Sequence, residues 1–320
     1  MVQQQDAELG KTRHGDCLFL EDNRCTIHTD QGAFAKPAVC QLYPLSLART
    51  PDGYYLSLTF SCPSVVMGGG QPLEEQLQAV VQTLDDSALY EENCLPPDIE
   101  IQLTACRATD WPDYLDLEPA MLRALLGERP IESCLRLAAG LVDLSLAERP
   151  LWEPPTCSTE SLRRTTQALP LLTAGAMAIL EHTDDVANRD LFCRKALKGE
   201  PQRSRLLKCP LPPLQYLEGV DDDSRVTVRR FLENFVRGKR LLQGGSVLAR
   251  LLALAVSLSI LNFYYAVGTQ VSPGSPGAHG YLAWCFDLIE TEILGHSDRF
   301  MPLFQTLENR LLMPEQARLR

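Results

Sequence analysis

The chain has 320 residues, of which 45% are apolar and 22% are charged, which predicts a folded protein and excludes wholesale disorder. The net charge of −11 is uneven, because residues 1–160 hold 10 Lys/Arg against 25 Asp/Glu while residues 161–320 hold 20 against 16. The acidic first half disfavours nucleic acid as a partner, since its phosphates would be repelled. A solvated acidic surface is the favoured interpretation of this charge, and a basic partner is the alternative.

Eleven cysteines without an apolar secretory segment near the N-terminus indicate a reducing compartment, so we expect a cytoplasmic protein. The odd number also disfavours a disulfide framework. Seven of the cysteines are scattered after residue 70. Those within helical patterns, such as Cys134 and Cys285, are interpreted as small buried apolar residues.

Turn residues and apolar periodicity divide the chain into a cysteine-cluster module over residues 1–70 and a helical domain over residues 71–320. The expected fold class is therefore mostly α. It is a helical body with a small N-terminal cysteine-rich module that contains a β-hairpin and short strands.

The first expected element of the module is the hairpin, because short β-prone runs flank the polar residues 21–24. A turn centred near Glu21 would place Cys17 and Cys25 opposite each other, with Cβ atoms about 5 Å apart. A turn at residues 22–23 would offset the two cysteines instead.

The second half of the module is expected to contain a short helical turn and a strand. Cys40 starts or ends the helical turn, which Pro44 closes. Residues 54–60 alternate between apolar and polar side chains, which predicts a strand that leads to Cys62. The three glycines at 68–70 then mark a linker.

After this linker, apolar residues recur at intervals of three and four, which predicts α-helices. The expected helices cover residues 73–89, 117–126, 131–146, 161–180, 225–242, 246–267, 281–294 and 299–312.

One of these helices is apolar enough to raise the question of a membrane span. Residues 251–267 form a run of seventeen without a charge, which is the lower limit for a spanning helix. The run contains Ser257, Ser259 and Asn262, and the sequence has no second such run. We therefore expect a buried core helix and no membrane association.

The chemistry of the chain is expected at its first four cysteines, which follow the spacing C-x7-C-x14-C-x21-C. The candidate metal ligands are Cys17, Cys25, Cys40 and Cys62. Thiolates are ligands of zinc and of iron–sulfur clusters, and four of them complete either set. His14 and His28 are alternative ligands, although a surface or hairpin role is the favoured interpretation of each. Four buried thiols without a metal are the alternative interpretation of the whole set.

Catalytic residues and a cofactor pocket are not assigned from the residues themselves. The sequence shows no G-x-G-x-x-G turn after a strand, no nucleophile elbow, no H-E-x-x-H and no P-loop. Tyr43, Tyr54 and Tyr55 are candidates to hold a lysine ammonium by cation–π contact, but packing is the favoured interpretation of these rings.

The cysteine segments resemble a known module. The run GDCLFLEDNRCTIHTDQGAFAKPAVCQLYPL, followed by YYLSLTFSCPS, is similar to the second half of the cysteine cluster in YkgJ-type proteins. It is most similar to the flagellin lysine-N-methylases of the FliB family. The resemblance is specific over residues 15–64 and diffuse beyond them.

This resemblance implies a zinc or iron–sulfur cofactor, S-adenosylmethionine as methyl donor, and a protein partner such as flagellin whose lysine side chains are modified. The family also has an upstream C-x2-C…CC cluster, whereas no cysteine precedes Cys17 here. Either the start is truncated or the chain keeps half of the ligand set, so we expect it to bind metal more readily than it methylates. The alternative is a non-catalytic cysteine-cluster protein whose metal is structural and whose helical body binds a partner.

Overall fold

The computed structural model describes residues 10, 17–22, 24–70, 72–85, 95–147, 157–182, 185–214, 222–271, 277–295 and 297–313. The chain divides into two compact units. Unit 1 comprises residues 1–43 and 71–92, and unit 2 comprises residues 44–70 and 93–320.

Unit 1 is built from short elements and one longer helix. They are β1 (Leu20–Glu21), β2 (Arg24–Cys25), α1 (Thr26–Gln31), η1 (Ala33–Ala35), α2 (Ala38–Leu42) and α4 (Leu73–Asp85). In the hairpin, Leu20 pairs with Cys25 and Glu21 pairs with Arg24. The turn therefore lies at residues 22–23, and Asp22 adopts a positive φ of 48° there. The offset arrangement is the one formed, with Leu20 rather than Cys17 opposite Cys25.

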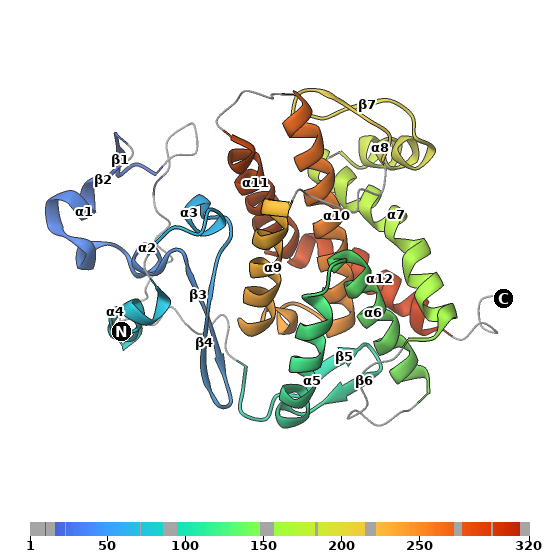
Figure 1. Ribbon diagram of the computed structural model, residues 1–320, viewed down its shortest axis with the longest axis horizontal. Coiled ribbons are helices and arrows are strands. Elements are labelled where there is room, and N and C mark those ends of the chain that lie inside the picture. Colours follow the sequence, from blue (N-terminus) through green and yellow to red (C-terminus); the bar gives the residue numbers. More distant parts are fainter. Residues whose placement is uncertain are drawn as a thin grey trace. The chain divides into compact units, whose positions relative to one another are not determined.

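Unit 2 holds most of the helices. Its first elements are β3 (Leu45–Thr50), β4 (Gly53–Leu58), α3 (Pro63–Val66), β5 (Ile101–Thr104), β6 (Arg107–Thr109), α5 (Trp111–Leu125), α6 (Pro130–Leu146), α7 (Thr159–Glu181) and α8 (Val186–Lys198). They are followed by β7 (Gln202–Arg203), β8 (Pro210–Leu211), α9 (Asp222–Arg237), η2 (Arg240–Leu242), α10 (Val247–Val271), α11 (Gly277–Asp287), the π-helix η3 (Leu288–Leu294) and α12 (Ser297–Leu312). The mostly α fold class is confirmed (Figure 1).

The observed unit boundaries differ from the expected division at residue 70. The strand before Cys62 is present as β4, but β4 and its antiparallel partner β3 belong to unit 2. Both backbone groups of Leu58 bond there to the side chain of Asn234 on α9. The helix that follows the glycines, α4, belongs to unit 1 and contacts α2.

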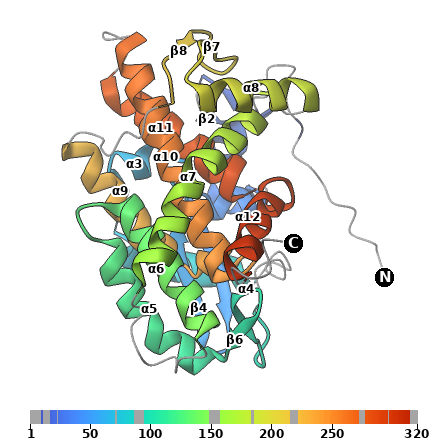
Figure 2. The same ribbon diagram turned by 90° about the vertical axis from the view of Figure 1, so that its right-hand side faces the viewer.

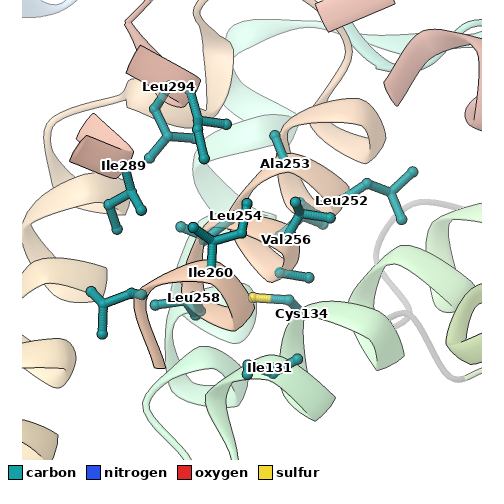
Figure 3. Close-up of a cluster of buried hydrophobic side chains, with 14 of the residues drawn as sticks. Ile131, Cys134, Leu252, Ala253, Leu254, Val256, Leu258, Ile260, Ile289 and Leu294 are labelled. Atoms are coloured by element: carbon teal, nitrogen blue, oxygen red, sulfur yellow. The ribbon is translucent and has the colours of Figure 1, made fainter. Parts of the chain in front are cut away.

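The core of unit 2 surrounds α10. This helix contacts α6, α7, α11, α12 and η3. Figures 1 and 2 show the four α-helices around it from two directions. Figure 3 shows α10 residues such as Leu254 and Ile260 among Cys134 of α6 and Ile289 and Leu294 of η3. The helix is long and apolar enough to cross a membrane, yet 94% of its most apolar window is buried inside the protein. The expectation of a buried core helix is confirmed.

Cys134 and Cys285 are both fully buried, as expected for small apolar residues. Burial raises the pKa of each thiol far above its ordinary value. Neither thiol is therefore available as a thiolate at neutral pH.

Two helices differ from those that the apolar periodicity predicts. The helix expected from residue 117 begins at Trp111, because the side chain of Asp110 accepts a hydrogen bond from the backbone N–H of Asp113 and caps the first turn. The helix α8 was not expected, since only Phe192 and Ala196 on it are buried and no apolar stripe results. It packs along α7 (Figure 2).

Candidate functional site

The four candidate ligands fall into both units. Cys17, Cys25 and Cys40 belong to unit 1, and Cys62 belongs to unit 2. All four are free, half-buried thiols. The role of Cys62 as the fourth ligand stays a prediction from the sequence.

Short turns position the three thiols of unit 1. The carbonyl of Cys17 accepts a hydrogen bond of 3.1 Å from the N–H of Leu20 at the start of the hairpin. Cys25 ends β2 and is the residue before the first turn of α1. Cys40 lies in α2, and its N–H bonds to the carbonyl of Pro37 at 2.8 Å. Cys17 and Cys25 therefore lie next to turns, and Cys40 lies within a short helix.

The electrostatics of Cys40 connect the three thiols. Burial raises the pKa of the Cys40 thiol, the ammonium of Lys36 lowers it, and the negative charges of Cys17 and Cys25 raise it again. Both other thiols are thus near enough for their charge to act on Cys40. A cation placed among the three would favour their thiolate forms.

Cysteine thiolates are suitable ligands for zinc or an iron–sulfur cluster, but the cysteines of unit 1 are not arranged as a complete set of metal ligands. Among the side chains that the structure describes, no group of three or more His, Cys, Asp or Glu could hold a metal ion. His28 is exposed on α1, and His14 lies outside the described residues. Any metal site in unit 1 therefore has to draw the thiols closer together.

Cys62 has a different environment, because it joins a strand end to a helix start. Its carbonyl accepts hydrogen bonds from the N–H groups of Val65 and Val66 at 3.0 and 3.2 Å. Pro63 occupies the first helical position, where its missing N–H costs nothing. Val66 is almost fully buried in the core of unit 2, while the sulfur of Cys62 stays half-buried.

A buried carboxylate holds the residues just before Cys62. One oxygen of Glu290, on η3, accepts hydrogen bonds of 2.7 Å from both the hydroxyl of Thr59 and the N–H of Ser61. Its other oxygen pairs with the guanidinium of Arg240. Glu290 is 3% exposed, so its charge is balanced inside the protein by Arg240.

The aromatic residues considered for a lysine pocket differ in exposure. Tyr43 and Tyr54 are exposed. The ammonium of Lys239 lies 4.1 Å from the centre of the Tyr55 ring and donates to both carboxylate oxygens of Glu118, at 2.6 and 2.8 Å. Tyr55 thus contacts a lysine of its own chain.

Sequence reasoning missed the buried charges Glu290, Arg240 and Arg250. Each lies beside apolar residues in the sequence, as charges on amphipathic surface helices also do. No local signal distinguishes the two cases, because the partners are far apart along the chain.

Comparisons with known proteins do not add to this description. The chain matches no protein-family model, no curated protein and no solved structure.

Proposed function

We propose that this protein binds zinc or an iron–sulfur cluster through cysteine thiolates of unit 1. The supporting observation is the small core of this unit. Of its residues whose side chains are described, only Leu42 and Val80 are buried, at 8% and 4% exposure. A unit of this size without a larger core is stabilised in other proteins by metals or disulfides. The half-buried free thiols of Cys17, Cys25 and Cys40 are suited to the first of these.

The small core of unit 1 also accounts for the distance between its three thiols. Metal sites of small modules are seldom formed in advance, and the free energy of binding then contributes to folding. Ligation in unit 1 would close the thiols around the metal and order the short elements that carry them. Unit 2 has its own large core around α10 and does not need this contribution.

The reaction is proposed from the resemblance of residues 15–64 to flagellin lysine-N-methylases. In this proposal the protein acts on lysine side chains of a protein partner with S-adenosylmethionine as methyl donor. The alternative is a structural metal in unit 1 and a partner-binding role for unit 2. The acidic first half of the chain suits a lysine-bearing partner in both cases.

Metal analysis tests the proposal. Protein purified without oxygen is expected to contain about one zinc, or iron with matching sulfide, and a Cys17→Ser/Cys40→Ser variant is expected to lose it. The control is Cys193→Ser, which changes a half-buried thiol on α8 of unit 2. Equal metal content in all three proteins would refute a site in unit 1.

A methylation assay tests whether the chain transfers methyl groups. The protein is incubated with labelled S-adenosylmethionine and a lysine-rich protein, and weak or no transfer is expected. Strong transfer that survives in a Cys40→Ser/Cys62→Ser variant would show that the active site lies elsewhere in the chain.

A further inference from the structure

We infer that the outer face of α8, together with the β7–β8 hairpin beside it, binds the surface of a membrane that contains anionic lipids. The contact is peripheral and needs no spanning helix. The inference concerns unit 2 alone and does not depend on the metal site proposed for unit 1.

The segment that carries this surface is basic, although the protein as a whole is acidic. Residues 185–208 hold seven Lys/Arg and three Asp/Glu, whereas the whole chain has a net charge of −11. Five of the basic residues are exposed, namely Arg194, Lys198, Arg203, Arg205 and Lys208. Arg203 and Arg205 also donate to backbone carbonyls, which leaves their charges in place. Because dissolved ions screen charges beyond about 8 Å at physiological ionic strength, a nearby anionic surface meets this local excess of positive charge.

The packing of α8 turns two of these charges outward. The buried residues of the helix are Phe192 and Ala196, which lie one turn apart on the side that faces the rest of the unit. Arg194 follows Phe192, and Lys198 follows Ala196, by a rotation of about 200° around the helix axis. Both cations therefore project from the opposite side. Figures 1 and 2 show α8 and the neighbouring β7 at one end of the helical unit.

Large apolar side chains are exposed among these charges. Four of them are between 38% and 65% exposed, namely Val186, Leu191, Leu197 and Leu206. Leu191, Arg194 and Leu197 follow one another at intervals of three residues, so apolar and cationic groups alternate on one side of the helix. Single exposed leucines are common on soluble proteins, whereas leucines among cations are typical of helices that lie in the membrane interface.

This combination favours a lipid surface over other acidic partners. Anionic headgroups attract Lys and Arg, and leucines on the same face enter the boundary between the headgroups and the acyl chains. A nucleic acid would pair with the cations through its phosphates and leave the leucines in water. An acidic protein would have to match the convex surface of a helix by its own shape, whereas a bilayer adapts to that surface.

Sedimentation of the full chain with lipid vesicles tests the inference. The probe is a vesicle of phosphatidylglycerol and phosphatidylcholine in equal parts, and vesicles of phosphatidylcholine alone are the comparison. We expect the protein to sediment with the anionic vesicles, to do so less at high salt, and to stay in solution with the neutral vesicles. A protein that stays in solution with the anionic vesicles would overturn the inference.

Two double substitutions separate the effect of α8 from that of net charge. Arg194→Gln/Lys198→Gln is expected to weaken binding about thirtyfold, because each basic side chain near an anionic surface contributes a factor of about five. The matched control is Arg229→Gln/Arg237→Gln, which removes two exposed charges of α9 in the same unit and should change binding little. Equal losses in the two variants would overturn the inference, since net charge alone would then account for binding.

A third variant distinguishes a lipid surface from an acidic macromolecule. Leu191→Ser/Leu197→Ser keeps every charge and is expected to weaken vesicle binding about tenfold. Unchanged binding would show attraction by charge alone and would overturn the lipid assignment in favour of a nucleic acid or an acidic protein. All the substituted side chains are exposed, so each variant should unfold at the urea concentration of the unmodified protein.

Discussion

We expect that the buried guanidinium of Arg250 can be replaced by an apolar side chain without a loss of stability. The residue is 1% exposed on α10, and its Nη1 donates a hydrogen bond of 3.2 Å to the carbonyl of Leu294. Its Nε and Nη2 have no hydrogen-bond partner among the described residues. Burial and, to a smaller extent, the charge of Arg240 lower the pKa of Arg250 to about 9. We predict that Arg250→Met leaves the protein at least as stable.

The magnitude follows from opposing contributions. A pKa lowered to about 9 from the ordinary value of an arginine corresponds to about 5 kcal/mol of penalty on the charged side chain. Removing Arg250 also removes one charged hydrogen bond, worth about 1.5–3 kcal/mol. It removes a contact of its guanidinium with the ring of Phe235, at 5.5 Å, worth about 0.5–2 kcal/mol. Methionine fills a similar space without a charge, so the expected change is between none and about 3 kcal/mol of stabilisation.

Urea unfolding followed by circular dichroism measures this change in the free energy of unfolding. The dependence of that free energy on urea concentration should be the same in both proteins. The control is Arg240→Met, the same substitution on the neighbouring arginine. It leaves the buried carboxylate of Glu290 without its cation and is expected to cost about 3–5 kcal/mol. A loss of more than about 2 kcal/mol in Arg250→Met would refute the reasoning, because the guanidinium would then have to be well compensated in the native protein.

Four further substitutions, in two pairs, test packing and a buried carboxylate. Gly238→Ala is expected to cost about 1–3 kcal/mol in urea unfolding, because the added Cβ would overlap the side chain of Ser57. The control is Gly175→Ala on α7, whose added Cβ would meet the two methyl groups of Leu303 at 3.6 Å. This substitution should stabilise the protein by up to about 1 kcal/mol. Equal changes in the two variants would contradict the close contact of Gly238 with Ser57. Glu181→Gln is expected to cost about 1–3 kcal/mol, because its carboxylate accepts hydrogen bonds from two backbone N–H groups and two hydroxyls, one of them that of Tyr264 at 2.6 Å. Tyr264→Phe removes one of these bonds and should cost about 1 kcal/mol, and a larger loss than in Glu181→Gln would contradict this assignment.

The apolar periodicity of the sequence determined most of the helices. Residues 131–146 and 161–180 repeat apolar side chains on one face, and the observed helices α6 and α7 differ from these ranges by one or two residues. The uncharged run at 251–267 determined the core helix, since a helix that is apolar on all faces has to be buried. These features depend only on residues that are neighbours along the chain.

The tertiary structure decided which segments belong together. The strand before Cys62 has an ordinary alternating pattern, and its place in unit 2 depends on Asn234, 176 positions from Leu58. The buried pair of Arg240 and Glu290 likewise joins positions 50 residues apart. Nothing in the local sequence distinguishes such residues from exposed ones.

The candidate site shows the same limit. The sequence identified the four cysteines by their local contexts, and it left the hairpin register open between two turns that differ by about one residue. The pairing of Leu20 with Cys25 settled that register. Cys62 belongs to the helical unit, where the residues just before it are held: Phe60 packs against Phe231 and Phe286, and Thr59 donates a hydrogen bond to Glu290. Local pattern specifies secondary structure, whereas burial and hydrogen bonding between distant residues decide where each functional side chain lies.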